Sequence, residues 1–101
     1  MILAFTHSAP AKVRIVTTLT DLASIAEEIG GERVAVTALS RGYQDPHFLE
    51  AKPSYMRLLN RADLLIYNGL ELEVGWLPLL IQGARNPDVS PGGQGHLDAS
   101  K

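Results

Sequence analysis

The segment RGYQDPHFLE, residues 41–50, gathers side chains that can hold a metal ion or move a proton. His47 is the strongest candidate for a chemical role, because a neutral imidazole is a common ligand of transition metals. Asp45 could accept a hydrogen bond from the other imidazole nitrogen, or it could simply stabilise the turn. Glu50 could play the same supporting role or be an ordinary solvated carboxylate. These alternatives stay open on spacing alone, since one histidine does not make a metal site.

Other chemical signatures are absent from the sequence. It contains no G-x-G-x-x-G, no G-x-x-x-x-G-K-[ST], no G-x-S-x-G and no pair of histidines at i, i+4, so we expect no catalytic residues. Glu71 and Glu73 are predicted at the start of a helix, where carboxylates meet the helix dipole favourably. Trp76 and Tyr55 are most simply core residues, and His96 is predicted to mark the start of a strand.

Length and composition bound the class of protein. The chain of 101 residues suits one domain, and its 46% hydrophobic content can supply a core. Nine basic and eleven acidic residues give a net charge of −2, which disfavours a nucleic-acid partner. The lack of cysteine excludes disulfides, thiolate metal sites and a cysteine nucleophile. No apolar run approaches the roughly 20 residues of a membrane span.

Strands and helices alternate along the sequence. Short β-branched or apolar runs predict strands at residues 12–18, 33–39 and 63–67. Helices are predicted after each strand: one with an N-cap at Thr20 or Asp21 and the apolar stripe Leu22, Ile25, Ala26 and Ile29, one opening at Pro53, and one over residues 73–81. This alternation predicts an α/β fold, a parallel sheet with flanking helices. The loop at residues 42–47 and the Asn68-Gly69 turn should then share the C-terminal rim of the sheet.

The two ends of the chain differ from this pattern. Residues 1–11 read as the remnant of a signal peptide or as a tail, because an apolar start leads to Ala9-Pro10-Ala11. Residues 12–101 form the predicted lobe, in which residues 83–95 are a Gly/Pro-rich loop. His96–Ser100 is predicted to begin a further strand, so the lobe is expected to be truncated.

The segment GYQDPHFLEAKPSYMRLLNRADLLIYNGLELEVGWL, residues 42–77, strongly resembles the zinc- and manganese-specific solute-binding proteins of bacterial ABC transporters. Residues 12–39 also look like that family's opening strand-helix-strand, so the resemblance covers about residues 12–100. The matching residues are Gly42, Asp45, Pro46, His47, Glu50, Pro53, Ser54, Leu58 or Leu59, Ala62, Asp63, Leu64, Asn68, Gly69, Leu72, Glu73 and Trp76.

The resemblance implies the N-terminal lobe of a two-lobed periplasmic protein that holds its metal between the lobes. His47 maps onto the first metal ligand, and the other three ligands of the family come later in the chain. We therefore expect an incomplete site for Zn²⁺, or alternatively Mn²⁺, in an N-terminal fragment that would serve an ABC-transporter membrane permease. The implied location is periplasmic, and the absence of cysteine favours a soluble form over a lipid-anchored one. The choice between zinc and manganese is set largely by the ligands that come later in the family's chain.

A metal site with a single protein ligand and a truncated lobe should differ physically from a complete protein. Zinc bound through a single imidazole should be weakly held, and its binding should fade as the pH falls through roughly 6.5, the reference pKa of histidine. A truncated lobe would expose a sheet edge, which predicts a homodimer or swapped assembly. One alternative is thus a self-associating interaction module without metal. A small enzyme using Asp45, His47 and Glu50 lacks any phosphate loop or nucleophile signature.

Overall fold

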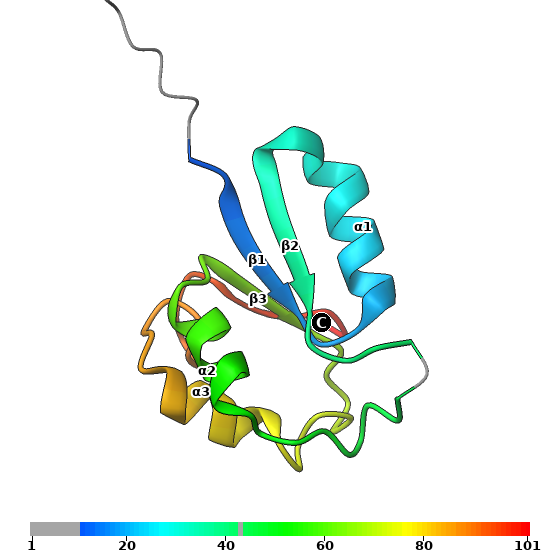
Figure 1. Cartoon of the computed structure of the whole chain (residues 1–101), viewed down its shortest axis with the longest axis vertical. Coiled ribbons are helices and arrows are strands. Elements are labelled where there is room, and N and C mark those ends of the chain that lie inside the picture. The colour runs from blue at the N-terminus through cyan, green and yellow to red at the C-terminus, as the bar shows by residue number, and fades with distance from the viewer. Residues whose placement is uncertain (1–10, 43) are drawn as a thin grey trace, which may run out of the picture.

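The computed structural model describes residues 11–42 and 44–101, which are organised around one parallel sheet. Its strands are β1 (Val13–Thr17), β2 (Val34–Ala38), β3 (Leu64–Tyr67) and β4 (His96–Asp98), in the order β2-β1-β3-β4 (Figure 1). Each neighbouring pair is parallel. The predicted α/β class and its parallel sheet are therefore confirmed. The leader assigned to residues 1–11 lies, apart from its last residue, outside the described residues, as does His7.

Helices cover both faces of this sheet. α1 (Thr20–Gly30) follows β1 and packs beside β2, with a 3-10 turn at Gly31–Arg33 before that strand. α2 (Pro53–Asn60) and α3 (Leu77–Ala84) contact each other and lie on the opposite side (Figure 1). Because the chain moves from β1 to β2 and then back to β3, its loops diverge at the C-terminal ends of the strands. Ligands of such sheets gather at that edge.

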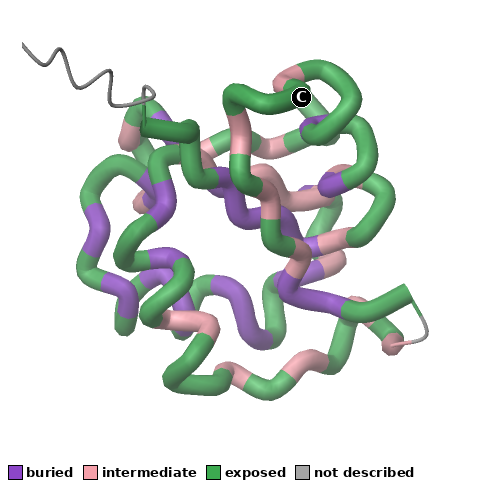
Figure 2. The backbone as a smooth tube through the Cα atoms, turned by 45° about the horizontal axis from the view of Figure 1, so that its top comes forward, coloured by how far each residue is buried: buried purple, intermediate pink, exposed green. Residues whose placement is uncertain are grey.

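The core lies between the sheet and the pair α2 and α3. Val16, in β1, pairs with Thr37 on one side and Leu65 on the other. Burial on both faces suits the β-branched composition of β1. The cluster of buried hydrophobic residues comprises Val16, Leu39, Leu59, Ala62, Leu65, Trp76, Leu77, Leu80, Ile81, Ala84 and Val89. All buried residues are purple on the backbone tube of Figure 2.

The buried face of α1 differs from the predicted stripe. Ala23 and Ala26 are buried, whereas Ile25 and Ile29 are 55% and 83% exposed. The small alanines permit a close approach to the sheet, and a Cβ on Gly30 would lie 3.0 Å from the Cβ of Val34. The predicted cap is also wrong. Leu19 is the N-cap, no side chain caps the helix, and Thr20 and Asp21 already lie within its first turn.

The third helix begins later than predicted. Residues 73–81 were expected to be helical, but α3 starts at Leu77 and the preceding residues form turns. Leu70 and Glu71 adopt positive φ values of 55° and 64°, which an α-helix does not tolerate. Pro78 lies in the first turn of α3, as expected from its missing N–H.

The segment after α3 is closely tied to α2. The side-chain amide of Asn86 donates to the carbonyls of Leu59, Asn60 and Ala62, at 2.9, 3.1 and 2.8 Å. Carbonyls at a helix C-terminus otherwise lack partners, so this one amide satisfies several of them. Val89 in the same segment is fully buried. None of the helices within the described residues has the length and apolar character needed to cross a membrane.

Candidate metal centre

Three loops meet where the strands end. The backbone N–H of Thr18, after β1, donates to the carbonyl of Ile66 in β3 at 3.1 Å. Ser40, after β2, donates through both its N–H and its hydroxyl to the carbonyl of Thr18. The loop that carries His47 therefore starts from a point fastened to the central strand.

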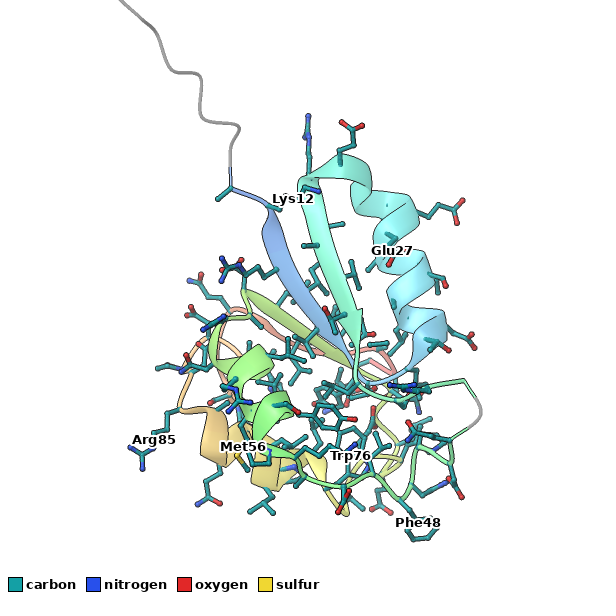
Figure 3. The ribbon with its side chains drawn as sticks, viewed as in Figure 1. Lys12, Glu27, Phe48, Met56, Trp76 and Arg85 are labelled. Atoms are coloured by element: carbon teal, nitrogen blue, oxygen red, sulfur yellow. The ribbon has the colours of Figure 1, made fainter. Side chains whose placement is uncertain are left out.

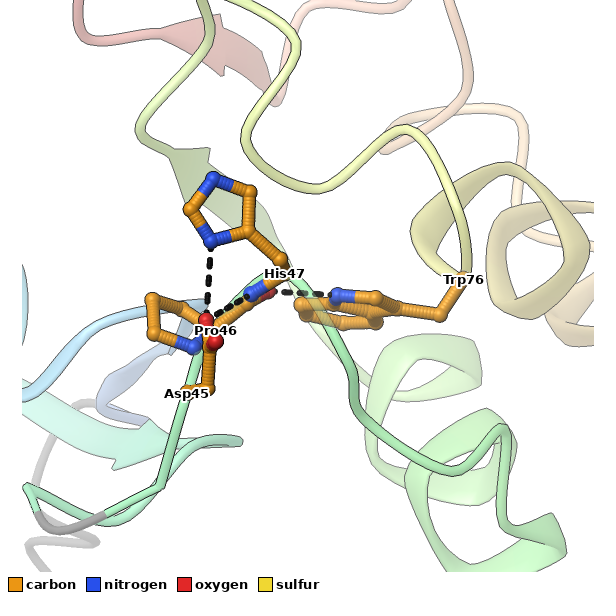
Figure 4. Close-up of polar contacts among 4 residues, drawn as sticks. All are labelled: Asp45, Pro46, His47 and Trp76. Atoms are coloured by element: carbon orange, nitrogen blue, oxygen red, sulfur yellow. Dashed lines mark hydrogen bonds and ion pairs between the residues drawn. The ribbon is translucent and has the colours of Figure 1, made fainter.

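Asp45, Pro46 and His47 form a tight turn in this loop (Figure 4). One carboxylate oxygen of Asp45 accepts from the backbone N–H of His47 at 3.0 Å and contacts its ring nitrogen Nδ1 at 2.8 Å. The carbonyl of Asp45 also accepts from the N–H of Phe48 at 3.1 Å. Proline suits this turn because its ring restricts the backbone between the two functional residues. Both side chains remain more than half exposed.

The charge of Asp45 decides which imidazole nitrogen is available. The hydrogen bond from the His47 backbone N–H, and then that from its ring, hold the pKa of Asp45 below its ordinary value. An ionised carboxylate can only accept, so the contact requires the proton of the neutral ring to be on Nδ1. The lone pair of Nε2 is then directed away from Asp45. That is the tautomer a metal ligand needs when its other nitrogen is hydrogen-bonded.

Glu50 is placed differently from Asp45. It is exposed, and its carbonyl accepts from the N–H of Lys52 at 2.9 Å. Within residues 11–42 and 44–101, Asp45 alone hydrogen-bonds the imidazole of His47. The structure thus brings one of the two predicted supporting carboxylates to the histidine. Phe48 follows on the outer side of the loop, 82% exposed (Figure 3).

Trp76 contacts the candidate site in a way that sequence reasoning missed. It was assigned to the core on a helical stripe, and it is indeed only 3% exposed. However, it precedes α3, and its indole Nε1–H donates to the carbonyl of Pro46 at 2.7 Å (Figure 4). The residues lie 30 positions apart, and no local pattern signals such a contact. Only the position of Trp76 in the family motif hinted at more than packing.

The environment of Glu73 also differs from the prediction. The residue was predicted to meet a helix dipole, but it lies before α3 and is only 3% exposed. Its carboxylate accepts from the hydroxyl of Thr18 and from the backbone N–H groups of Asn68 and Gly69. A buried charge is stable only when it is hydrogen-bonded in this way. Glu73 therefore joins the ends of β1 and β3. Glu71, two residues earlier, is exposed.

His96 begins β4, as predicted, and lies in a different environment from His47. Its Nδ1 contacts the carbonyl of Val89 at 2.8 Å and its Nε2 contacts the hydroxyl of Tyr67 at 3.0 Å. Burial, and then the charges of Asp98 and Glu73, raise the pKa of Tyr67. Both nitrogens of His96 thus have partners already. No group of three or more His, Asp or Glu side chains within the described residues could hold a metal.

Comparisons with known proteins agree on one family. Residues 15–100 match the family described as "ZnuA: Zinc-uptake complex component A periplasmic". The manganese ABC transporter substrate-binding lipoprotein scaA of Streptococcus gordonii is 31% identical over 86 residues, covering 82% of this chain and 28% of the relative. PsaA of Streptococcus pneumoniae, also described as a manganese ABC transporter substrate-binding lipoprotein, is 35% identical over 80 residues, covering 76% of this chain and 26% of the relative. The chain thus spans about a quarter of the length of these relatives.

Solved structures give the same result. The periplasmic zinc-binding protein TroA of Treponema pallidum is 31% identical with a TM-score of 0.66, covering 74% of this chain and 27% of TroA. A crystal structure of ZnuA is 32% identical with a TM-score of 0.67, covering 74% of this chain and 29% of ZnuA. At these values the likeness extends to sequence as well as to fold.

Proposed function

Since this chain belongs to the ZnuA family of metal-binding proteins of ABC transporters, we propose that it contributes His47 to the binding of a divalent transition metal destined for uptake. The family consists of solute-binding transport proteins, and the expectation of a non-enzymatic role is thereby confirmed. The metal is cargo in this proposal, not a catalyst. Zinc is the first candidate and manganese the alternative, because both metals occur in the names of the relatives.

The observation that carries the proposal is the arrangement around His47. Asp45 contacts Nδ1 of His47 and accepts from its backbone N–H, and the other ring nitrogen is left for a ligand. Zinc sites in proteins use about four ligands, so one imidazole supplies a fraction of the affinity. In this proposal the remaining ligands are not among the described residues, and the site is complete only when they converge on His47.

Location and partner follow from the relatives. They are described as a periplasmic protein or as lipoproteins of ABC transporters. We therefore infer that the whole protein acts outside the cytoplasmic membrane and passes its metal to the transporter's permease. Self-association through a sheet edge stays a prediction, which the molar mass from light scattering would test.

Two neighbouring carboxylates offer a matched test of this site. In a zinc titration followed by the NMR signals of the His47 ring, Asp45→Ala is expected to weaken binding about tenfold, because the ring loses the partner that fixes its tautomer. Glu50→Ala removes an equal charge from the same loop but no contact with the ring, so its effect should stay within about twofold. Equal losses in the two variants would mean that only the charge of the loop matters. The absence of any zinc response at His47 in the unaltered chain would contradict the proposal.

A further inference from the structure

The short turn at residues 73–76 connects the buried core to the loop that carries His47. At its first residue, the Glu73 carboxylate is bonded to Thr18, Asn68 and Gly69. At its last residue, the Trp76 indole N–H is bonded to the carbonyl of Pro46. The turn is thus held by side chains at both ends, and its second attachment lies immediately before His47.

Hydrogen bonds also hold the backbone of this turn. The carbonyl of Glu73 accepts from the N–H of Trp76 at 3.2 Å and from that of Leu77 at 3.0 Å. Between them, Gly75 lies against the His47 loop, and a Cβ at Gly75 would be 3.6 Å from the carbonyl oxygen of His47. The turn therefore lies beside the backbone of Pro46 and His47, and the indole N–H of Trp76 is hydrogen-bonded to Pro46.

We propose that Trp76 is a positioning residue for His47: its indole N–H fixes the Pro46 carbonyl, and the Glu73 carboxylate fixes the turn that carries Trp76. This inference rests on the proposed role of His47 in metal binding. A histidine on an exposed loop samples many orientations unless the backbone beneath it is held. With the loop fastened by Ser40 at one end and by Trp76 at the other, the imidazole is presented in one orientation before any metal arrives.

Trp76→Phe is the direct test, since it keeps an aromatic ring and removes the single N–H donor. In the metal-free chain at about pH 8, where an ordinary imidazole is neutral, the ring nitrogen shifts of His47 should move toward the average of the two tautomers, because a freed Pro46 carbonyl lets the His47 backbone move and weakens the contact of the ring with Asp45. The zinc dissociation constant at His47 should rise about tenfold. The ring signals of His96 serve as an internal control and should not move, because its partners are Val89 and Tyr67.

A core variant separates positioning from general loosening. Ile81→Val removes one methyl group from α3 in the same buried cluster and leaves the indole bond intact. It should leave the His47 signals as they are in the unaltered chain. The inference is overturned if Trp76→Phe leaves the His47 signals unchanged, or if Ile81→Val changes them equally.

A measurement on the unaltered chain covers the case in which Trp76→Phe does not fold. The chain has one tryptophan, so its indole N–H gives a single resonance. That resonance should shift during a zinc titration with the same midpoint as the His47 signals, and a fixed resonance would overturn the inference.

The positioning role of Trp76 and the metal-binding role of His47 can also fail separately. Reorientation of His47 in metal-free Trp76→Phe without any zinc binding would retain the positioning role and reject the metal role.

Discussion

Replacing His47 by alanine should abolish the specific binding of zinc to this chain. The substitution removes the only ring nitrogen of the described residues that the proposal assigns to the metal, and a carboxylate alone holds zinc weakly in water. The free energy of unfolding should change by no more than about 0.5 kcal/mol, because the side chain is 58% exposed. A competitive zinc titration of both chains, together with their urea denaturation curves, measures the two quantities.

His96→Ala is the matched control for that experiment. It removes an imidazole whose nitrogens both have hydrogen-bond partners, so it should leave the zinc titration unchanged. Tight, stoichiometric binding that His47→Ala eliminates would mean that the site is completed, for instance by a second copy of the chain. Weak binding eliminated by the same variant would mean that capture needs ligands from elsewhere. An undiminished zinc affinity in His47→Ala would contradict the assignment.

Replacing Glu73 by alanine should cost about 3 kcal/mol of the free energy of unfolding. The carboxylate receives three hydrogen bonds in a site that is 3% exposed, and hydrogen bonds to charged groups each contribute about 1.5–3 kcal/mol before the neighbours relax. Without it, the Thr18 hydroxyl and two backbone N–H groups lose their partner. The free energy of unfolding of a domain of this size is only about 5–15 kcal/mol, so the urea concentration at the unfolding midpoint should fall markedly.

Two variants make that measurement specific. Glu71→Ala, two residues away, removes an exposed carboxylate at a backbone of positive φ and should cost less than about 0.5 kcal/mol. Glu73→Gln keeps the side-chain length but turns an NH₂ group toward N–H donors, so an intermediate loss is expected. If Glu73→Ala and Glu71→Ala were equally mild, the buried carboxylate would not hold the loops together.

Much of the fold could be predicted because its signals are local. The β-branched run before Thr18 predicts a buried strand, and Pro53 predicts the first turn of a helix, since each depends on the residue's own conformational preferences. The predicted stripe of α1 failed at Ile25 and Ile29 because apolar residues lie on more than one side of this helix, and their spacing does not say which side packs against the sheet. The packed side carries Ala23 and Ala26, which only the tertiary structure reveals.

The sequence by itself determined the alternation of strands and helices, the parallel sheet, and the Asp-Pro-His turn with His47 as the candidate ligand. Asp45 belongs to this part, since its contact with His47 spans two residues and follows from the turn. The tertiary structure decided the roles of Glu73 and Trp76. A carboxylate or an indole has the same local preferences whether or not its polar atoms are hydrogen-bonded to a distant residue. Glu73 bonds Thr18, 55 residues away, and Trp76 bonds Pro46, 30 residues away. Only folding brings such groups within hydrogen-bond distance.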